Sequence, residues 1–464
     1  MSFVCVICSD SYTGNGTEHS IFSTKCGHLF GKSCLEKWAR ENNNQGKFKC
    51  PVCCEPVRDS DYHQIYDLPK ELLKIKFDDG EDVCCNEDDI LKRCLLGTLD
   101  KESTFFIEID DRELSREFIT FFDVHNGFIL VAGNHEYLCA ETDSFKYFLR
   151  IYKGLEIFYD RVFGSVPFTT VTFNKFREDV VEFCVGFENG SLQSVVLTSN
   201  NGICGTPHER VLFNEDSKIN SVCFLEKNNV VYSVGECNIF SVSTDIAFDK
   251  ENWLGNVNVE LTAVTNLAVM NNCVLFGIMD GKVYVFEKNK IPYVLYCEEE
   301  TLVTNYTYDS VINMISIVNS LEFEGDEESD EKVASHVLRI ISKVSKYDNA
   351  GYRRDIYISS PFQDLQDSIY ELPQQFKSTL ILMKDYEKCF IYSFIPNIEN
   401  GMLQVHFVND NFNVVNEKEI EGLDECIGVL ELEKPKLLLS KVLKIPLVII
   451  FNNRLTTLNY YTVI

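Results

Sequence analysis

The sequence predicts a small cysteine-rich domain of the α+β class, followed by an all-β domain folded as a β-propeller of seven blades. Three observations support this architecture. Seven of the 19 cysteines fall within the first 54 residues. From about residue 101, short runs rich in Val, Ile, Phe and Tyr alternate with turns of Gly, Asn and Asp. Similar units then recur every ~45–50 residues, which is the period of a propeller blade.

The cysteine-rich segment carries potential metal ligands at regular spacing. Clustered cysteines in a reducing compartment are more typical of metal sites than of disulfides, and zinc prefers four thiolate or imidazole ligands. In the RING layout, ligand pairs alternate between two zinc ions. The first ion would take Cys5, Cys8 and Cys34. The second would take Cys26, His28, Cys50 and Cys53. Residues 1–60 therefore predict a RING-type finger with two Zn²⁺ sites, with a LIM or PHD fold as the alternative.

The first site lacks one standard ligand. A complete RING has Cys or His three residues after its histidine, and here that position is Gly31. His19, Cys54 or a water molecule could complete the shell. Because an isolated histidine in a loop is more often solvent-exposed than metal-bound, we expect His19 to be an exposed loop residue.

Three apolar residues accompany the ligands: Ile7, Trp38 on a short helix, and Pro51. In RING ligases these positions form the patch that binds a ubiquitin-conjugating enzyme (E2), and exposed apolar clusters mark partner sites. The alternative is that Trp38 packs on the domain core. Active RING fingers often add a basic residue after the last ligand. Here Cys54 and Glu55 follow, so Arg58 substitutes, or activity is weak, or another element helps.

Net charge is unevenly distributed along the chain. The whole chain carries −28, yet residues 1–60 hold seven Lys and Arg against six Asp and Glu. A strongly acidic body repels phosphate backbones, so we expect no direct nucleic-acid binding and favour a basic protein partner. The chain opens without an apolar signal region, and no run of 18 apolar residues predicts a membrane span. These features indicate a nuclear or cytosolic protein without membrane association.

The remaining organisation follows from local patterns. Residues 61–100 read as a connector with short helices, including one from Asp88 to Leu96. Residues 101–464 form the predicted propeller, in which hairpins are marked by turns such as Asn189-Gly190 and Asp280-Gly281. The Gly-His and Trp-Asp marks of WD40 blades are absent, so the domain is at most WD40-like. Two β-sandwich domains are the alternative. The acidic run at 322–331 reads as a solvated loop or as a docking strip for a basic partner.

The segment from Cys26 to Gly31, with glycine at a ligand position, resembles the RING finger and WD repeat domain E3 ligases that work with replication protein A. Residues 57–62 and Ile65-Tyr66 resemble the segment that follows the RING in that family. The resemblance implies an E3 ubiquitin ligase of the DNA damage and repair response in the nucleus. Its RING would bind E2 and its WD repeat propeller would recruit substrate, including replication protein A. A non-catalytic RING–propeller scaffold and a SUMO ligase are the alternatives.

Overall fold

The computed structural model contains two compact units, one of residues 1–103 with Val463 and Ile464, and one of residues 104–462. It describes the chain apart from residues 1–4, 9–11, 13–16, 18, 43–45, 59, 66–85, 101–102, 115–116, 136–145, 201–202, 237, 246–249, 256–261, 272, 298–300, 310–313, 322–332, 348–352, 364–376, 379, 386–387, 399, 408–412 and 440. The predicted acidic loop at 322–331 and the first connector helix lie outside the described residues. No helix in the described part is long and apolar enough to span a bilayer.

The N-terminal unit is built from short strands and two helices. A three-stranded antiparallel sheet has the order β2-β1-β5, and a second sheet pairs β3 with β4. The elements are β1 (Ile21–Thr24), β2 (Leu29–Gly31), α1 (Lys32–Glu41), β3 (Lys47–Lys49), β4 (Pro56–Arg58), β5 (Tyr62–Gln64) and α2 (Glu87–Leu96). Helix α2 is the connector helix expected from Asp88 to Leu96. The Asn86 side chain caps its first turn by accepting from the amide of Asp89 at 2.9 Å.

The hydrophobic core of this unit is small. One cluster contains Phe30 and Leu35 with Phe48 and Val57, and a second contains Cys5, Tyr12 and Ile21. So few buried side chains do not stabilise a domain of this size on their own, and such domains need metal or disulfide crosslinks.

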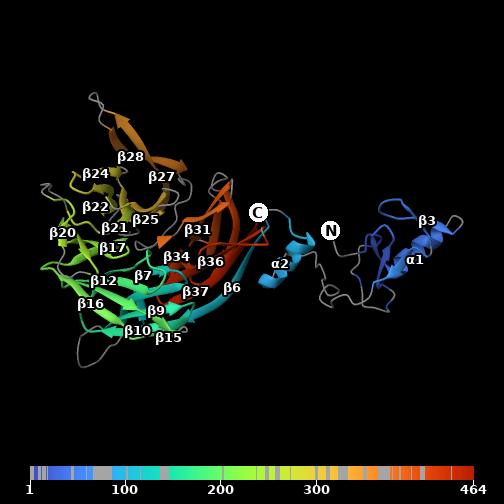
Figure 1. Cartoon of the computed structure of the whole chain (residues 1–464), viewed down its shortest axis with the longest axis horizontal. Helices are drawn as coiled ribbons and strands as arrows, with labels where there is room; N and C mark the ends of the chain where they lie inside the picture. Colours follow the sequence, from blue (N-terminus) through green and yellow to red (C-terminus); the bar gives the residue numbers. More distant parts are fainter. Residues whose placement is uncertain are drawn as a thin grey trace. The chain divides into compact units, whose positions relative to one another are not determined.

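The second unit is a series of four-stranded antiparallel sheets, each a blade formed by consecutive stretches of chain (Figure 1). The first four are β7–β10 (Glu117–His125, Phe128–His135, Lys146–Lys153, Glu156–Phe163), β11–β13 with β16 (Phe168–Phe173, Val181–Phe187, Ser191–Leu197, His208–Asn214), β17–β20 (Ile219–Glu226, Asn229–Val234, Asn238–Ser243, Lys250–Asn252) and β21–β24 (Asn266–Asn271, Val274–Met279, Lys282–Glu287, Tyr293–Tyr296). The next two are β25–β28 (Thr301–Asp309, Met314–Leu321, Val333–Tyr347, Arg353–Gln363) and β30–β33 (Leu380–Asp385, Lys388–Asn397, Met402–Phe407, Asn413–Glu419).

The seventh sheet combines both ends of this unit. Strands β34 (Cys426–Glu431), β36 (Val442–Phe451) and β37 (Arg454–Val463) come from the end of the chain, and β6 (Thr104–Glu113) completes the sheet. Figure 1 shows β6 beside β37, with which it pairs antiparallel from Thr104 to Glu113. Two short strands also belong to this sheet: β29 (Lys377–Ser378) pairs parallel with β34, and β35 (Lys436–Leu438) pairs antiparallel with β36. Strands β14 (Ser199–Asn200) and β15 (Ile203–Cys204) pair with each other, and η1 (Leu423–Glu425) precedes β34. This arrangement confirms the all-β prediction and is consistent with a propeller.

Apolar side chains fill the space between successive sheets. Phe122 of the first sheet packs with Val448 and Ile450 of the seventh, so the first and last sheets share one core cluster. Further clusters join the first sheet to the second, the second to the third, and the third to the fourth. Inner strands such as β22 are buried along their whole length and therefore read as nearly continuous hydrophobic segments, whereas outer strands such as β16 are largely exposed.

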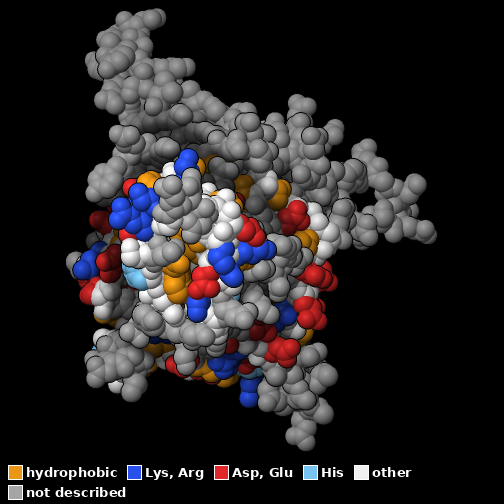
Figure 2. Space-filling view, turned by 90° about the vertical axis from the view of Figure 1, so that its right-hand side faces the viewer, with side chains coloured by type: hydrophobic (Ala, Val, Ile, Leu, Met, Phe, Trp, Pro, Cys, Tyr) orange, Lys and Arg blue, Asp and Glu red, His pale blue; other side chains and the backbone are white. Residues whose placement is uncertain are grey.

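Of the two predicted tight turns, Asp280-Gly281 has positive φ at both residues, whereas at Asn189-Gly190 only Gly190, with φ of 81°, does. At the hairpin between β22 and β23, Asp280 and Gly281 have φ of 50° and 65°. Positive φ at both central residues is the geometry of the hairpin turns that Asp-Gly favours. On the face drawn in Figure 2, acidic and basic side chains are interspersed and the described hydrophobic side chains form small groups.

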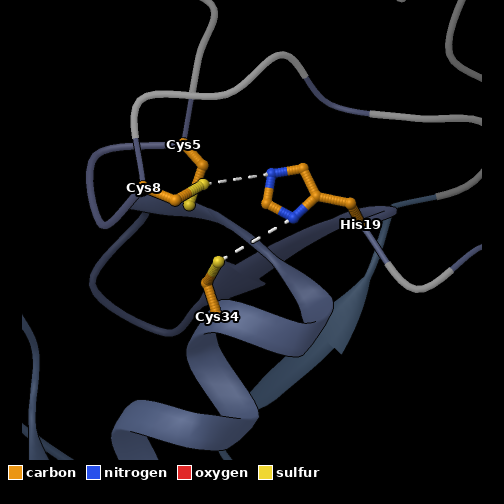
Figure 3. Close-up of side chains that lie close together, drawn as sticks. All are labelled: Cys5, Cys8, His19 and Cys34. Atoms are coloured by element: carbon orange, nitrogen blue, oxygen red, sulfur yellow. Dashed lines mark hydrogen bonds between the residues drawn. The ribbon is translucent and has the colours of Figure 1, made fainter.

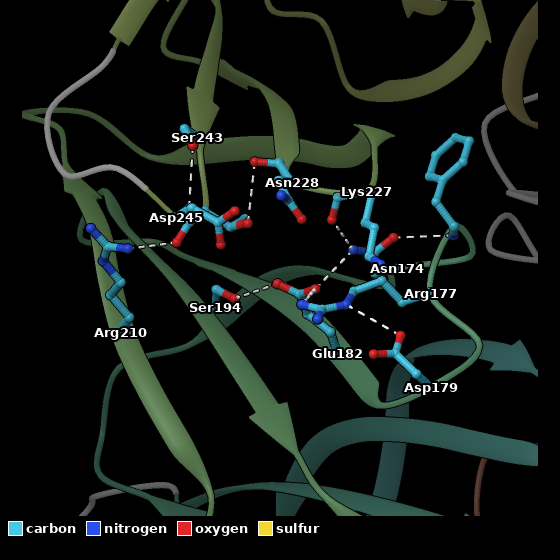
Figure 4. Close-up of polar contacts among 12 residues, drawn as sticks. Asn174, Arg177, Asp179, Glu182, Ser194, Arg210, Lys227, Asn228, Ser243 and Asp245 are labelled. Atoms are coloured by element: carbon cyan, nitrogen blue, oxygen red, sulfur yellow. Dashed lines mark hydrogen bonds and ion pairs between the residues drawn. The ribbon is translucent and has the colours of Figure 1, made fainter.

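A buried carboxylate organises the loop between β11 and β12. Glu182, 2% exposed, accepts hydrogen bonds from Asn174 Nδ2 at 2.8 Å, Arg177 Nη1 at 3.1 Å and Ser194 Oγ at 3.3 Å (Figure 4). Asn174 Nδ2 also donates to the carbonyl of Lys227, at 2.8 Å, in the next sheet. The network therefore fixes the loop and links two neighbouring blades.

Candidate metal centre and partner groove

The second ligand group forms where two turns of the chain meet. Cys26 and His28 lie in the β1–β2 turn, where Gly27 has φ of 84°, and Cys50 and Cys53 lie in the turn between β3 and β4. The Nδ1 atom of His28 is 3.3 Å from Cys26 Sγ and 3.8 Å from Cys50 Sγ. The structure thus brings together all four residues that the spacing assigned to this site.

The thiols of this group differ in acidity. Burial raises the pKa of Cys26, but hydrogen bonds with Thr24 Oγ1, at 3.0 Å, and with His28 outweigh it and bring the pKa to about 6. Burial dominates at Cys50 and raises its pKa to about 11. Because zinc binds the thiolate, Cys26 offers a ready ligand, whereas Cys50 must lose its proton as the metal binds.

The first ligand group contains four residues rather than three. Cys5, Cys8 and Cys34 surround the imidazole of His19, as Figure 3 shows. His19 Nε2 lies 3.6 Å from Cys8 Sγ, and its Nδ1 lies 3.8 Å from Cys34 Sγ. Cys34 is on the first turn of α1, and the Gly31 amide donates to Cys5 Sγ at 3.2 Å.

The expectation that His19 is an exposed loop residue was wrong. Its ring lies among the three thiols and stacks on Tyr12, with ring centroids 6.0 Å apart. Tyr12 is buried, and this burial, together with the charges of Cys5, Cys8 and Cys34, raises its pKa. Loop position alone favoured exposure, whereas the site supplies a place for one more donor.

Both groups have the dimensions of a tetrahedral zinc site. Within each group the potential ligand atoms all lie within 4.8 Å of one another. Zinc–sulfur bonds of ~2.3 Å and zinc–nitrogen bonds of ~2.0 Å place adjacent ligands about 3.5–3.8 Å apart. The distances from His28 Nδ1 to two thiols, 3.3 and 3.8 Å, are close to this spacing, while in the first group the two short distances run from opposite nitrogens of the His19 ring. Two Cys₃His donor sets, one from each group, are therefore suited to two zinc ions. When bound, zinc crosslinks segments that the small core leaves weakly held.

A groove lies next to the second metal site. Its volume is about 630 Å³, and it is lined by Trp38, Asn42, Lys47, Phe48, Lys49, Cys50, Pro51, Cys54 and Pro56. The Trp38 ring is half-buried, and its Nε1 donates to the carbonyl of Lys49 at 3.0 Å, which fixes the indole orientation. The Trp38 side chain both packs on the core and forms a wall of the groove.

Of the three residues in the predicted E2 patch, two share this groove. Trp38 and Pro51 line it, whereas Ile7 does not and packs instead against both small core clusters. Arg58 is exposed at the end of β4 and is not among the lining residues. The two lining lysines, Lys47 and Lys49, are exposed and supply positive charge at the groove that spacing arguments missed.

Comparison with known proteins gives this unit its family. Residues 3–54 match the model of the ring finger domain. The N-terminal segment is a RING finger. The mouse (Mus musculus) E3 ubiquitin-protein ligase RFWD3 is 39% identical over 62 residues, and its human (Homo sapiens) counterpart is 36% identical over 62 residues. The probable E3 ubiquitin-protein ligase XERICO of Arabidopsis thaliana is 40% identical over 53 residues.

These similarities are confined to the RING finger. The matches to RFWD3 cover 13% of this chain and 7% of that protein, and the match to XERICO covers 11% of this chain and 28% of that protein. The propeller unit contributes nothing to them. The relatives support the assignment of the finger.

Proposed function

We propose that this protein is a RING-type E3 ubiquitin ligase whose finger binds an E2 enzyme carrying ubiquitin. The observation that carries the proposal is the juxtaposition of two four-donor metal groups with the groove of Trp38 and Pro51. A half-buried tryptophan beside a proline, held by a hydrogen bond, is a typical rigid anchor for a protein partner. The names of the similar ligases support the same reaction.

The chemistry expected of this finger is positional. No side chain at the groove needs to form a bond with ubiquitin, because the reactive thioester belongs to the E2 enzyme. The finger would hold the charged E2 in a conformation open to attack by a substrate lysine, which is catalysis by orientation and population shift. The zinc ions keep α1 and the β3–β4 turn, the two sides of the groove, in fixed positions.

The test is ubiquitin chain formation by the full chain with E1, a panel of E2 enzymes and ubiquitin. Trp38→Ala and Pro51→Ala each remove part of the groove and should lower the rate by roughly 30-fold, the effect of a 2 kcal/mol interface anchor. Arg40→Ala is the matched control, because Arg40 is exposed on the same helix but does not line the groove. Its rate should stay unchanged.

Because Trp38 also packs on the core, each variant must retain two zinc ions per chain by elemental analysis. Pro51 lies outside the core clusters and separates loss of the groove from loss of the fold. Equal rates for wild type and both groove variants would refute the assignment of this groove. Ile7→Ala is a poor probe, since Ile7 supports both clusters.

A non-catalytic scaffold is the second candidate, and one observation favours it. Cys54 and Glu55 follow the last ligand, where many active RING fingers place a basic residue. A fully zinc-loaded chain that forms no ubiquitin chains with any E2 enzyme would establish this alternative. Transfer of SUMO but not ubiquitin in the same assay would identify a SUMO ligase.

We further propose that the propeller recruits the substrate in the nucleus, with replication protein A as the first partner to examine. The excess of acidic residues outside the finger favours a partner protein with a basic surface. Residues 104–462, purified apart from the finger as the propeller unit, provide the bait once cooperative unfolding shows that they fold. Enrichment of replication protein A over an unrelated propeller is expected, and its absence would remove this partner.

A further inference from the structure

Gly31 does not owe its place to backbone strain. It ends β2 and precedes α1 with φ of −68° and ψ of 137°, an extended conformation that any residue adopts. Gly27, by contrast, has φ of 84°, which favours glycine. The reason for glycine at position 31 must therefore lie in the surroundings of its missing side chain.

The imidazole of His19 fills that space. A Cβ atom at position 31 would lie 2.1 Å from His19 Cε1, 2.3 Å from Nδ1 and 2.7 Å from Nε2. Contacts this short do not occur between non-bonded atoms, so any side chain at position 31 must displace the ring. The His19 ring has little room to move away, because it stacks on the buried Tyr12 and faces the thiols of Cys8 and Cys34.

The same distances place position 31 at the metal. The imidazole that a Cβ atom would overlap is the one that completes the first ligand group. The Gly31 amide is itself 3.2 Å from Cys5 Sγ. A thiol extending from Cβ at position 31 would therefore occupy the region that the His19 ring now fills.

We propose that Gly31 determines which residue is the fourth ligand of the first zinc site. Glycine at position 31 admits His19. A ligating side chain at position 31 displaces His19 and replaces it as a donor. A non-ligating side chain displaces His19 but supplies no donor in its place, so only the three thiols of Cys5, Cys8 and Cys34 remain.

The test compares two substitutions at the same position in the full chain. Gly31→Ala should release one of two zinc ions to a chelator at least tenfold faster than wild type, and His19→Ala should do the same. Gly31→Cys should retain both ions, although its side chain is the larger of the two. The double variant His19→Ala/Gly31→Cys should retain both as well, because the histidine is no longer needed. Lys32→Ala, next in the chain, is the control and should match wild type.

Cobalt substitution supplies a second readout. The wild-type first site is a Cys₃His set, and the double variant converts it to four thiolates. The cobalt d–d bands should then move to longer wavelength and the sulfur-to-cobalt charge-transfer band should gain intensity. Zinc loss from Gly31→Cys as fast as from Gly31→Ala would overturn the proposal, as would full zinc retention in Gly31→Ala or in His19→Ala. None of these readouts depends on ubiquitin transfer, so they are separate from the test of the proposed function.

Discussion

Removing the Glu182 carboxylate should destabilise the propeller unit by about 3–5 kcal/mol, the cost of breaking a buried ion pair from one side. The free energies of its three hydrogen bonds, added together, give a similar loss of stability. The bond from Arg177, at 3.1 Å, is charge-assisted and contributes roughly 1.5–3 kcal/mol, while those from Asn174 and Ser194 contribute about 1 kcal/mol each. Glu182→Ala leaves all three donors without this acceptor and opens a space in a region where Glu182 is 2% exposed.

The assay is thermal unfolding of the full chain. An unfolding entropy of about 2.1 cal/mol/K per residue gives about 0.75 kcal/mol/K for the unit of residues 104–462, so the predicted loss lowers Tm by about 4–7 °C. Glu182→Gln keeps the shape and one acceptor oxygen and should lose less than half as much. Glu178→Ala is the matched control, because that side chain is 78% exposed and its ion pair with Lys434 spans 3.9 Å. A Glu182→Ala shift no larger than that of Glu178→Ala would refute the reasoning.

Two further predictions concern the metal and the blade core. Chelation of zinc should unfold the finger but not the propeller, because among the described residues both groups suited to a metal lie in the finger. One tryptophan lies in each unit, so fluorescence reports the unfolding of the finger and of the propeller separately. Trp38 fluorescence should change, while Trp253, fully buried in the propeller, should not, and simultaneous loss of both signals would contradict independent units. Phe122→Ala should cost about 3–5 kcal/mol in urea unfolding, because Phe122 fills the core shared by the first and last sheets. Val211→Ala, on an exposed outer strand, should stay within about 0.5 kcal/mol, and equal effects would show that this shared core adds little.

Much of the fold followed from local chemistry. Turns such as Asp280-Gly281 require positive φ, and the apolar runs beside them have the length of strands, so both the hairpins and their period were readable. The pairing of β6 with β37 was not, because it joins segments more than 300 residues apart and no local pattern encodes it. Glu182 was equally hidden. A lone acidic residue in a strand gives no sign of burial until Asn174, Arg177 and Ser194 are seen around it.

The metal site shows where spacing rules stop. Six of the seven predicted ligands follow from Cys-x2-Cys and Cys-x-His spacing, because these motifs place donors on one ion through local turns, and Cys34 follows from the RING layout. Of the three residues predicted to form the E2 patch, Trp38 and Pro51 line one groove, while Ile7 is half-buried and packs against both small clusters. His19 was named as one of three possible donors, but its loop position favoured an exposed side chain. Only the three-dimensional arrangement shows that its ring lies among the thiols and that a side chain at position 31 would overlap it.

The first zinc site therefore separates two requirements that a sequence motif merges. Zinc fixes where four donor atoms must lie in space, while the motif records the chain positions from which donors usually come. Glycine at position 31 breaks the motif but preserves the tetrahedron, because the volume it vacates is the volume that His19 needs. A finger with glycine at this position and a histidine in the preceding loop is then a complete Cys₃His site rather than a degenerate one. Helix α1 carries both Cys34, a donor of the first metal group, and Trp38, which lines the partner groove. A complete first site would therefore hold in place the helix that forms one wall of the groove.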